Sequence, residues 1–240
     1  MKILRRATDA LLSLLFPPHC AMCSAATLAR RHLCGPCLEM AAKIKAPFCR
    51  QCSQPFDGAI DGAFTCSNCE DRRFHFDCAV SRYRATGLVR ELVHRFKYDR
   101  CLYLRAPLAE WLAETLEDER ILAHPFDWIV PVPLHAARMR EREFNQADVL
   151  AQLVAERHGE RVLHALKRIR YTTTQTRLDR EERMQNLRNA FRVRHSRRVS
   201  GSHLILVDDV FTTGSTVDEC ARVLKESGAA SVRVITVARG

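Results

Sequence analysis

The chain has 240 residues, enough for one or two domains with a hydrophobic core. Its 38 lysines and arginines exceed its 28 aspartates and glutamates, and the resulting net charge of +10 predicts an anionic ligand or partner. No stretch approaches the roughly 20 apolar residues of a membrane-spanning helix, so the sequence predicts no transmembrane segment.

Residues 1–18 carry a few basic side chains followed by a short apolar run. Signal peptides have a similar order, but here the run leads directly into two prolines and no small-residue cleavage site follows. Ile3, Ala7 and Leu11 share one face of a helix, with polar residues opposite. We therefore expect an amphipathic N-terminal helix that docks on the rest of a cytoplasmic protein. Peripheral membrane contact is an alternative for which the basic residues are too few.

Four C-x-x-C pairs follow within residues 19–75. They form two blocks of four thiols, namely Cys20, Cys23, Cys34 and Cys37, then Cys49, Cys52, Cys66 and Cys69. Four thiolates carried on two tight turns are the ligand set of a structural tetrahedral Zn²⁺ site. The segment has few large apolar residues, so bound metal would supply much of its folding energy.

Disulfide bonds and redox chemistry are the other interpretations of these cysteines. Disulfides would require an export signal, which the sequence does not indicate, and a redox C-x-x-C occurs once rather than four times in series. We therefore expect two structural zinc sites in a small domain at residues 19–75. The sequence favours sequential pairing of the C-x-x-C motifs and leaves open an interleaved arrangement, in which the first pair joins the third.

The rest of the chain, residues 76–240, has the element order of an α/β domain. Residues 76–83 alternate as a strand does, and apolar residues then recur at helical spacing over residues 88–98 and 104–116. Residues 126–133 are predicted to form a short apolar strand, whose prolines keep the backbone extended. This order is typical of a parallel sheet with helices on its faces.

The loop after this second strand carries Arg138 and Arg142 and leads to a helix whose expected cap is Asn145. The plainer interpretation is a connecting loop with solvent-exposed charges. The alternative is an anion-binding loop, because parallel sheets place ligands beyond the carboxyl ends of their strands. In that case this loop and a later acidic loop would meet in one crevice.

An arginine-rich segment comes next. Residues 161–198 contain twelve lysines and arginines against three acidic residues, a net charge of +9 that accounts for nearly all of the excess in the chain. Apolar periodicity is weak before Leu187, so we expect either a mobile functional loop or a surface that faces nucleic acid. Residues 190–193 then return to a strand.

The most informative stretch is residues 203–216, which read HLILVDDVFTTGST. Apolar residues predict a buried strand, two carboxylates follow, and a loop of hydroxyl-bearing residues and glycine precedes a helix; residues 231–238 add a closing strand. Loop N–H groups and a helix N-terminus favour an anion, whereas carboxylates accept hydrogen bonds from sugar hydroxyls. The stretch therefore predicts a ribose 5-phosphate site. An ordinary turn capped by an aspartate would explain only one Asp and one Thr.

These residues resemble the phosphoribosyl-pyrophosphate (PRPP) motif of type I phosphoribosyltransferases. The resemblance implies that Asp208 and Asp209 are the catalytic carboxylates, which hold the ribose 2′- and 3′-hydroxyls. We expect both to face solvent at the strand end. It also implies that the 5-phosphate is bound by Val210, Phe211, Thr212, Thr213, Gly214, Ser215 and Thr216. Mg²⁺ would accompany the pyrophosphate of PRPP and need few protein ligands.

Further motifs extend the resemblance over almost the whole chain. VPVPL, FNQA, the pattern TxxQTxLxRxxRxxNLxxAF and the four C-x-x-C pairs are together similar to the ComF/GntX family. Membership implies a type I phosphoribosyltransferase-like parallel-sheet α/β domain at residues 76–240, preceded by a small cysteine-rich zinc-ribbon domain. It also implies a role in handling incoming single-stranded DNA during natural transformation, together with the DNA-uptake machinery at the inner face of the membrane.

In a working transferase, arginines would neutralise the leaving pyrophosphate, since the guanidinium fork matches phosphate oxygens. The candidates are Arg138, Arg142, Arg168, Arg170 and Arg183. One residue departs from the family pattern, because Glu143 stands where the family has glycine before FNQ. Glutamate is expected to give neither the positive φ nor the close phosphate approach that glycine permits.

Three functions fit these features. The first is a PRPP-binding protein that handles DNA, the second is an active phosphoribosyltransferase of unknown acceptor, and the third is a non-catalytic PRPP-sensing regulator. No general base or base-recognition segment names an acceptor. Tyr171 and Phe191 are the few aromatic residues of the arginine-rich segment, which argues against base stacking as the main mode of DNA contact.

Overall fold

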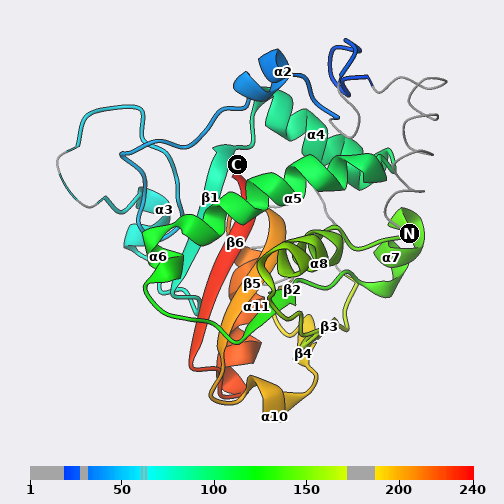
Figure 1. Cartoon of the computed structure of the whole chain (residues 1–240). Coiled ribbons are helices and arrows are strands. Elements are labelled where there is room, and N and C mark those ends of the chain that lie inside the picture. The colour runs from blue at the N-terminus through cyan, green and yellow to red at the C-terminus, as the bar shows by residue number, and fades with distance from the viewer. Residues whose placement is uncertain (1–18, 28–31, 61, 63, 172–186) are drawn as a thin grey trace.

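The computed structural model in Figure 1 describes most of the chain. The described residues are 19–27, 32–60, 62, 64–171 and 187–240. Two sequence predictions, the amphipathic helix at residues 1–18 and the role of Arg183, lie outside them.

A four-stranded parallel sheet forms the centre of the fold, with strand order β1-β6-β5-β2. Its strands are β1 (Cys78–Arg84), β2 (Trp128–Pro131), β5 (His203–Phe211) and β6 (Ser231–Arg239). The two central strands are apolar along most of their length and buried, as expected for a parallel sheet covered by helices. The sequence predicted each of these strands, and the parallel α/β class is confirmed.

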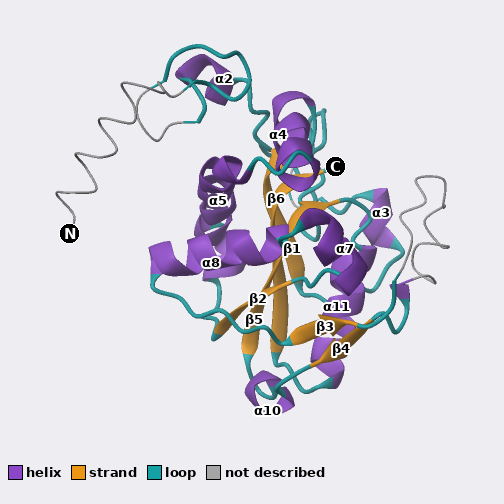
Figure 2. Cartoon of the chain, turned by 90° about the vertical axis from the view of Figure 1, so that its right-hand side faces the viewer, coloured by secondary structure: helices purple, strands orange, loops and turns teal. Residues whose placement is uncertain are grey.

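Helices cover both faces of this sheet (Figure 2). On one face α5 (Arg105–Ala113) packs beside α8 (Gln146–His158), and α11 (Ser215–Glu226) lies on the other. At the carboxyl ends of the strands lies α4 (Gly87–Tyr98), whose buried residues include the predicted apolar stripe. The carboxyl end of β5 and the start of α11 therefore lie at the same edge of the sheet as α4.

The helix predicted at residues 104–116 is divided into shorter pieces. They are η1 (Leu102–Leu104), α5, η2 (Glu114–Glu117) and α6 (Glu119–Leu122). The Thr115 hydroxyl donates to the Leu112 carbonyl at 2.6 Å, which competes with regular helical pairing. Asp118 then caps α6 by accepting a hydrogen bond from a backbone N–H. Apolar periodicity continues through these breaks, so it did not reveal them.

A small second sheet lies within the arginine-rich segment. There β3 (Leu166–Arg168) pairs antiparallel with β4 (Phe191–Val193), which lies within the strand predicted at residues 190–193. The partner strand β3 was not predicted, because three residues are too few to display a period of two. A short helix, α10 (Ser196–Val199), follows, and β4 packs against α11.

The cysteine-rich segment consists mainly of turns, with two short helices, α2 (Gly35–Glu39) and α3 (Ser67–Glu70). Each helix begins directly after one of the predicted metal ligands. The second half of the segment attaches to β1, where the buried Ser53 hydroxyl donates to the Ala79 carbonyl at 2.9 Å. That half of the segment is therefore packed against the sheet.

Candidate functional site

Two groups of four cysteines have the geometry of structural zinc sites. They are Cys20, Cys23, Cys34 and Cys37, and Cys49, Cys52, Cys66 and Cys69. Within each group the sulfur atoms all lie within 4.8 Å of one another. The Cys66 sulfur is 3.6 Å from those of Cys52 and Cys69, close to the roughly 3.8 Å edge of a tetrahedron with zinc–sulfur bonds of about 2.3 Å. The residues therefore fit zinc, and the sequential pairing is confirmed over the interleaved one.

Asp208 and Asp209 lie near the carboxyl end of β5, as predicted, but Asp209 does not face open solvent. Its side chain is buried, and its Oδ2 atom lies 2.7 Å from Nζ of Lys97 on α4. The expectation that both carboxylates face solvent is therefore wrong for Asp209. A buried carboxylate requires a compensating charge, and Lys97 supplies it.

Asp208 is only partly exposed; its Oδ1 accepts a hydrogen bond from the Asp209 N–H at 2.9 Å, and among the described residues it forms no ion pair like that of Asp209. Burial, together with the neighbouring charge of Asp209, raises the pKa of Asp208 to about 7. The positive charges of Lys97 and Arg168 oppose this shift. The two adjacent carboxylates therefore differ: Asp209 is held by an ion pair, and Asp208 is partly protonated at neutral pH.

Lys97 is the residue of this site that the sequence analysis missed. Burial acts to lower the pKa of Lys97, but the charge of Asp209 outweighs it and raises the pKa. Lys97 lies in the last turn of an amphipathic helix, where a cation is ordinarily a favourable match to the helix dipole. Because that explanation suffices, and because Lys97 is far from β5 in the sequence, nothing in the sequence indicated that Lys97 pairs with an aspartate of the acidic pair.

The predicted phosphate loop connects β5 to α11. Gly214 precedes the first residue of the helix and has φ of 79°, a conformation that favours glycine. A Cβ atom at this position would also lie 2.6 Å from the buried ring of Phe211. The Thr213 and Ser215 hydroxyl oxygens are 3.0 Å apart. A tight loop bearing hydroxyls at the start of a twelve-residue helix favours an anion.

The side chains of this loop differ in exposure. Thr212 is exposed, Val210, Thr213 and Thr216 are partly exposed, and Phe211 and Ser215 are buried. Phe211 can therefore contribute to a ligand site through its backbone but not through its ring, which packs beneath the loop. The hydroxyl groups are the accessible part of the predicted phosphate cradle.

The other predicted anion loop forms a helix, α7 (Ala136–Arg142), and not an irregular connection. Asn145 caps the next helix as predicted, accepting from the Ala147 N–H at 3.2 Å. The expectation that Glu143 gives no positive φ is wrong: this residue ends α7 with φ of 67° and thus adopts the conformation that the family glycine permits. Its carboxylate forms an exposed ion pair with Arg100 at 2.9 Å. The turn at residue 143 is therefore formed as it would be with glycine, although a glutamate side chain is present there.

The predicted arginines do not all gather at one place. Arg168 and Arg138 lie close enough that, after burial, the charge of Arg138 lowers the pKa of Arg168, while Asp208 raises it. Arg142 lies over the Tyr98 ring, 4.7 Å from its centroid. Arg170 is exposed and donates to the backbone of the arginine-rich segment. Of the predicted arginines, Arg168 therefore lies near Asp208, and Arg138 lies near Arg168.

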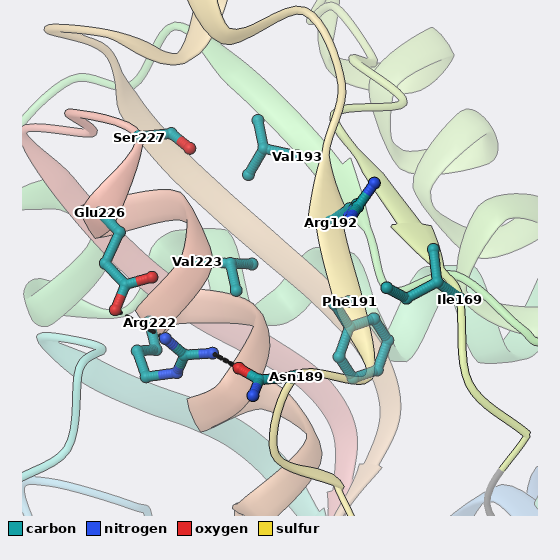
Figure 3. Close-up of a pocket in the computed structure, with 9 residues that line it drawn as sticks. All are labelled: Ile169, Asn189, Phe191, Arg192, Val193, Arg222, Val223, Glu226 and Ser227. Atoms are coloured by element: carbon teal, nitrogen blue, oxygen red, sulfur yellow. Dashed lines mark hydrogen bonds and ion pairs between the residues drawn. The ribbon is translucent and has the colours of Figure 1, made fainter.

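A separate pocket of about 360 Å³ lies between β4 and α11 (Figure 3). Its lining residues are Ile169, Asn189, Phe191, Arg192, Val193, Arg222, Val223, Glu226 and Ser227. The Arg222 guanidinium is already paired with Glu219 at 2.7 Å and Glu226 at 2.6 Å. Neither aspartate of the acidic pair and no residue of the loop 212–216 lines this pocket, so it is not the predicted phosphate site.

Known proteins share this organisation. Models of the double zinc ribbon domain and the phosphoribosyl transferase domain match residues 11–70 and 146–240. DNA utilization protein YhgH of Salmonella typhi is 37% identical over 210 residues, which cover 86% of this chain and 90% of that protein. Competence protein F of Haemophilus influenzae is 31% identical over 218 residues, covering 88% and 92%. Glutamine PRPP amidotransferase from B. subtilis, solved with ADP and GMP, is 25% identical, with coverage of 54% and 25% and a TM-score of 0.37.

The expected architecture is thereby established: a parallel-sheet α/β domain of the phosphoribosyltransferase type with an N-terminal double zinc ribbon that carries two groups of four cysteines. Within the part of the chain that the structure describes, no helix is long and apolar enough to cross a membrane. With identity above 30% over most of both chains, the protein belongs to the ComF/GntX family, that of competence protein F and DNA utilization protein YhgH.

Proposed function

We propose that the protein binds PRPP, with Mg²⁺, at the carboxyl end of β5. The observation that carries this proposal is the meeting of two kinds of group at one edge of the sheet. Asp208 and Asp209 accept hydrogen bonds from ribose hydroxyls, and the loop from Thr212 to Thr216 with the start of α11 binds the 5-phosphate. Arg168 stands near Asp208 with Arg138 close to it, and both guanidinium groups suit the pyrophosphate.

Mg²⁺ fits this arrangement because its preferred ligands are oxygens and it keeps several of its waters. The carboxylates of Asp208 and Asp209 are the oxygen donors that the protein offers at this edge. When bound, the ion neutralises charge on the pyrophosphate. The raised pKa of Asp208 supports a further expectation, that a cation at the site draws off its proton.

Titration calorimetry with PRPP and Mg²⁺ tests this proposal, with inorganic phosphate as the comparison. PRPP is expected to bind at one site per chain, and more tightly than phosphate, because the ribose contacts add to those of the phosphate loop. Release of pyrophosphate in the same mixture would mark turnover. Equal affinity for PRPP and phosphate would contradict the ribose assignment.

We further propose that the protein acts in the handling of single-stranded DNA through its arginine-rich segment. The names of the related proteins refer to DNA utilization and competence. All but one of the described basic side chains of residues 161–198 are exposed: Arg161, Lys167, Arg170, Arg188, Arg192, Arg194, Arg197 and Arg198. A dense exposed positive surface supports contact with the phosphate backbone. Binding of a labelled oligonucleotide, measured across salt concentrations, tests this role, and binding that does not depend on salt would contradict it.

A further inference from the structure

Arg239, in β6, joins the second zinc site to the phosphate loop. This residue is buried, with only 4% of its surface exposed. Nη1 donates to the carbonyl of Phe211 at 3.3 Å and to that of Thr212 at 2.8 Å. Nη2 lies 4.0 Å from the sulfur of Cys52, a member of the second cysteine group. One buried side chain therefore contacts both a metal ligand and the loop that leads into α11.

The position of Cys52 explains how a buried cation is tolerated here. Burying an arginine requires a nearby negative charge and filled hydrogen bonds. Cys52 is fully buried, and four thiolates around one divalent zinc keep a net negative charge. The occupied zinc site is thus a counter-charge for Arg239, fixed in place by the metal.

Arg72 is a second connection between the same zinc site and the same loop. Its backbone N–H donates to the carbonyl of Cys69 at 3.3 Å, and its Nη1 donates to the carbonyl of Thr213 at 3.1 Å. Successive carbonyls of residues 211–213 are therefore held by two arginines. Because the C=O and N–H of a trans peptide point in opposite directions, the N–H groups of the following residues face away from the arginines, toward the side where an anion would bind.

The chain between the second zinc site and β1 supports the loop in two further ways. The Phe76 ring meets Phe211 edge-on at 5.9 Å between centroids, and Phe211 in turn fills the space beside Gly214. The backbone N–H of His75 donates to Oδ1 of Asp218, in the first turn of α11, at 2.6 Å. The loop is therefore fixed from beneath at its carbonyls, at its aromatic ring and at the start of its helix.

We propose that the second zinc site positions the phosphate loop for anion binding, with Arg239 and Arg72 as the positioning residues. The identity of the ligand in this inference rests on the proposed PRPP function. The contacts that hold the loop in place do not depend on any ligand. Coupling between two sites is reciprocal. Removing zinc from the second site therefore weakens PRPP binding, and bound PRPP raises the affinity of that site for zinc. The first zinc site contacts α4 instead, where Arg95 donates to the Ala21 carbonyl.

A matched pair of buried arginines on β6 tests the role of Arg239. Arg233 is 3% exposed and donates to backbone carbonyls that include that of Pro125, away from the loop. In calorimetry with PRPP and Mg²⁺, Arg239→Gln is expected to weaken binding about tenfold, because two charge-assisted hydrogen bonds that orient the loop are lost. Arg233→Gln should leave the affinity of the folded protein unchanged. Equal affinity in both variants and the wild type would overturn the inference.

Amide hydrogen exchange tests the same support without any ligand. Cys69→Ser removes a ligand of the second site, and Cys34→Ser removes one of the first. Exchange at residues 212–216 is expected to rise at least about tenfold in Cys69→Ser and to stay unchanged in Cys34→Ser. If wild-type protein binds no PRPP, the proposed function fails, and this exchange measurement alone decides the inference. Unchanged exchange in Cys69→Ser would refute the coupling.

Discussion

Nζ of Lys97 lies 2.7 Å from Oδ2 of Asp209, where the last turn of α4 passes the carboxyl end of β5. This ion pair lets a buried strand end carry two adjacent carboxylates. Lys97 compensates the charge of Asp209, and the raised pKa of Asp208 leaves the second carboxyl partly protonated at neutral pH. A cationic helix end and a titrating aspartate thus prepare the same site for a ligand with hydroxyl groups and a divalent cation.

Removing the lysine should destabilise the fold. Lys97→Met leaves the charge of Asp209 buried and uncompensated, at a cost of about 3–5 kcal/mol in the free energy of unfolding. The loss should be greater at pH 8 than at pH 5, because Asp208, whose pKa is about 7, is ionised at pH 8 and Lys97 then compensates two neighbouring carboxylates. Urea denaturation at the two pH values measures both effects.

The control for this prediction is Lys43→Met, since Lys43 forms an exposed ion pair with Glu114 at 2.9 Å. An exposed pair contributes about 0–1 kcal/mol. If the two methionine variants lose the same small free energy at both pH values, the Lys97 ion pair has no structural importance.

The raised pKa of Asp208 predicts a pH dependence of stability. The pKa of this carboxyl group is about 7 in the folded protein, whereas its ordinary value is 3.8. The folded state therefore binds more protons between these values, and stability falls as pH rises from about 4 to 7. The fall should level off above pH 7, where Asp208 is ionised in both states.

Asp208→Asn removes this contribution. Relative to the variant, wild-type protein should lose on the order of 2 kcal/mol between pH 4 and pH 7, less than the full shift implies because nearby solvent screens the repulsion. Denaturation midpoints of both proteins across this range provide the measurement. Parallel stability curves would mean that the pKa of Asp208 is ordinary in the folded state.

The sequence predicted the parts of the site that a local pattern can encode. The HLILVDDVFTTGST stretch revealed the strand, the carboxylates and the helix start, because all of them lie within 14 consecutive residues. Four C-x-x-C pairs likewise predicted two metal sites and favoured their sequential pairing, and the fold was needed only to exclude the interleaved arrangement. In both cases the chemistry depends on neighbours along the chain.

The remainder depends on residues that are far apart in sequence. Lys97 and Arg239 have ordinary local explanations, a helix C-terminus and a strand, and only the fold brings them to the acidic pair and the phosphate loop. Glu143 illustrates the opposite error, since a family glycine was expected to be needed for positive φ. The capping turn of α7 imposes that conformation on glutamate.

The metal prediction concerns stoichiometry and independence of the two sites. Purified protein should contain about two zinc ions per chain, as expected for two four-thiolate centres. Cys34→Ser should lower this to about one and unfold the first block, while residues 79–240 stay folded. Metal analysis combined with circular dichroism gives both values. Metal-free protein with oxidised cysteines would contradict the assignment.

The DNA prediction concerns the salt dependence of binding. Replacing Arg188 and Arg197 by alanine should weaken oligonucleotide binding at low salt. It should also flatten the dependence of log K on log salt by about 0.7 for each lost phosphate contact to single-stranded DNA. The matched control replaces Arg90 and Arg105, which are exposed but lie outside the arginine-rich segment. An equal change of slope in both double variants would remove the specific role of that segment.

The central claim, that this strand end binds a ribose phosphate, is tested most directly by PRPP calorimetry on Asp208→Asn. This variant keeps the Lys97–Asp209 ion pair, so the scaffold stays intact, and Asp148→Asn serves as the control, because the Asp148 carboxylate contacts His164 and not Lys97. Loss of hydrogen bonds from ribose hydroxyls to a charged acceptor, roughly 1.5–3 kcal/mol each, should weaken PRPP binding about tenfold or more. Inorganic phosphate should bind equally well or better, because a nearby negative charge is removed. PRPP affinity equal to that of wild type and of Asp148→Asn would contradict the account.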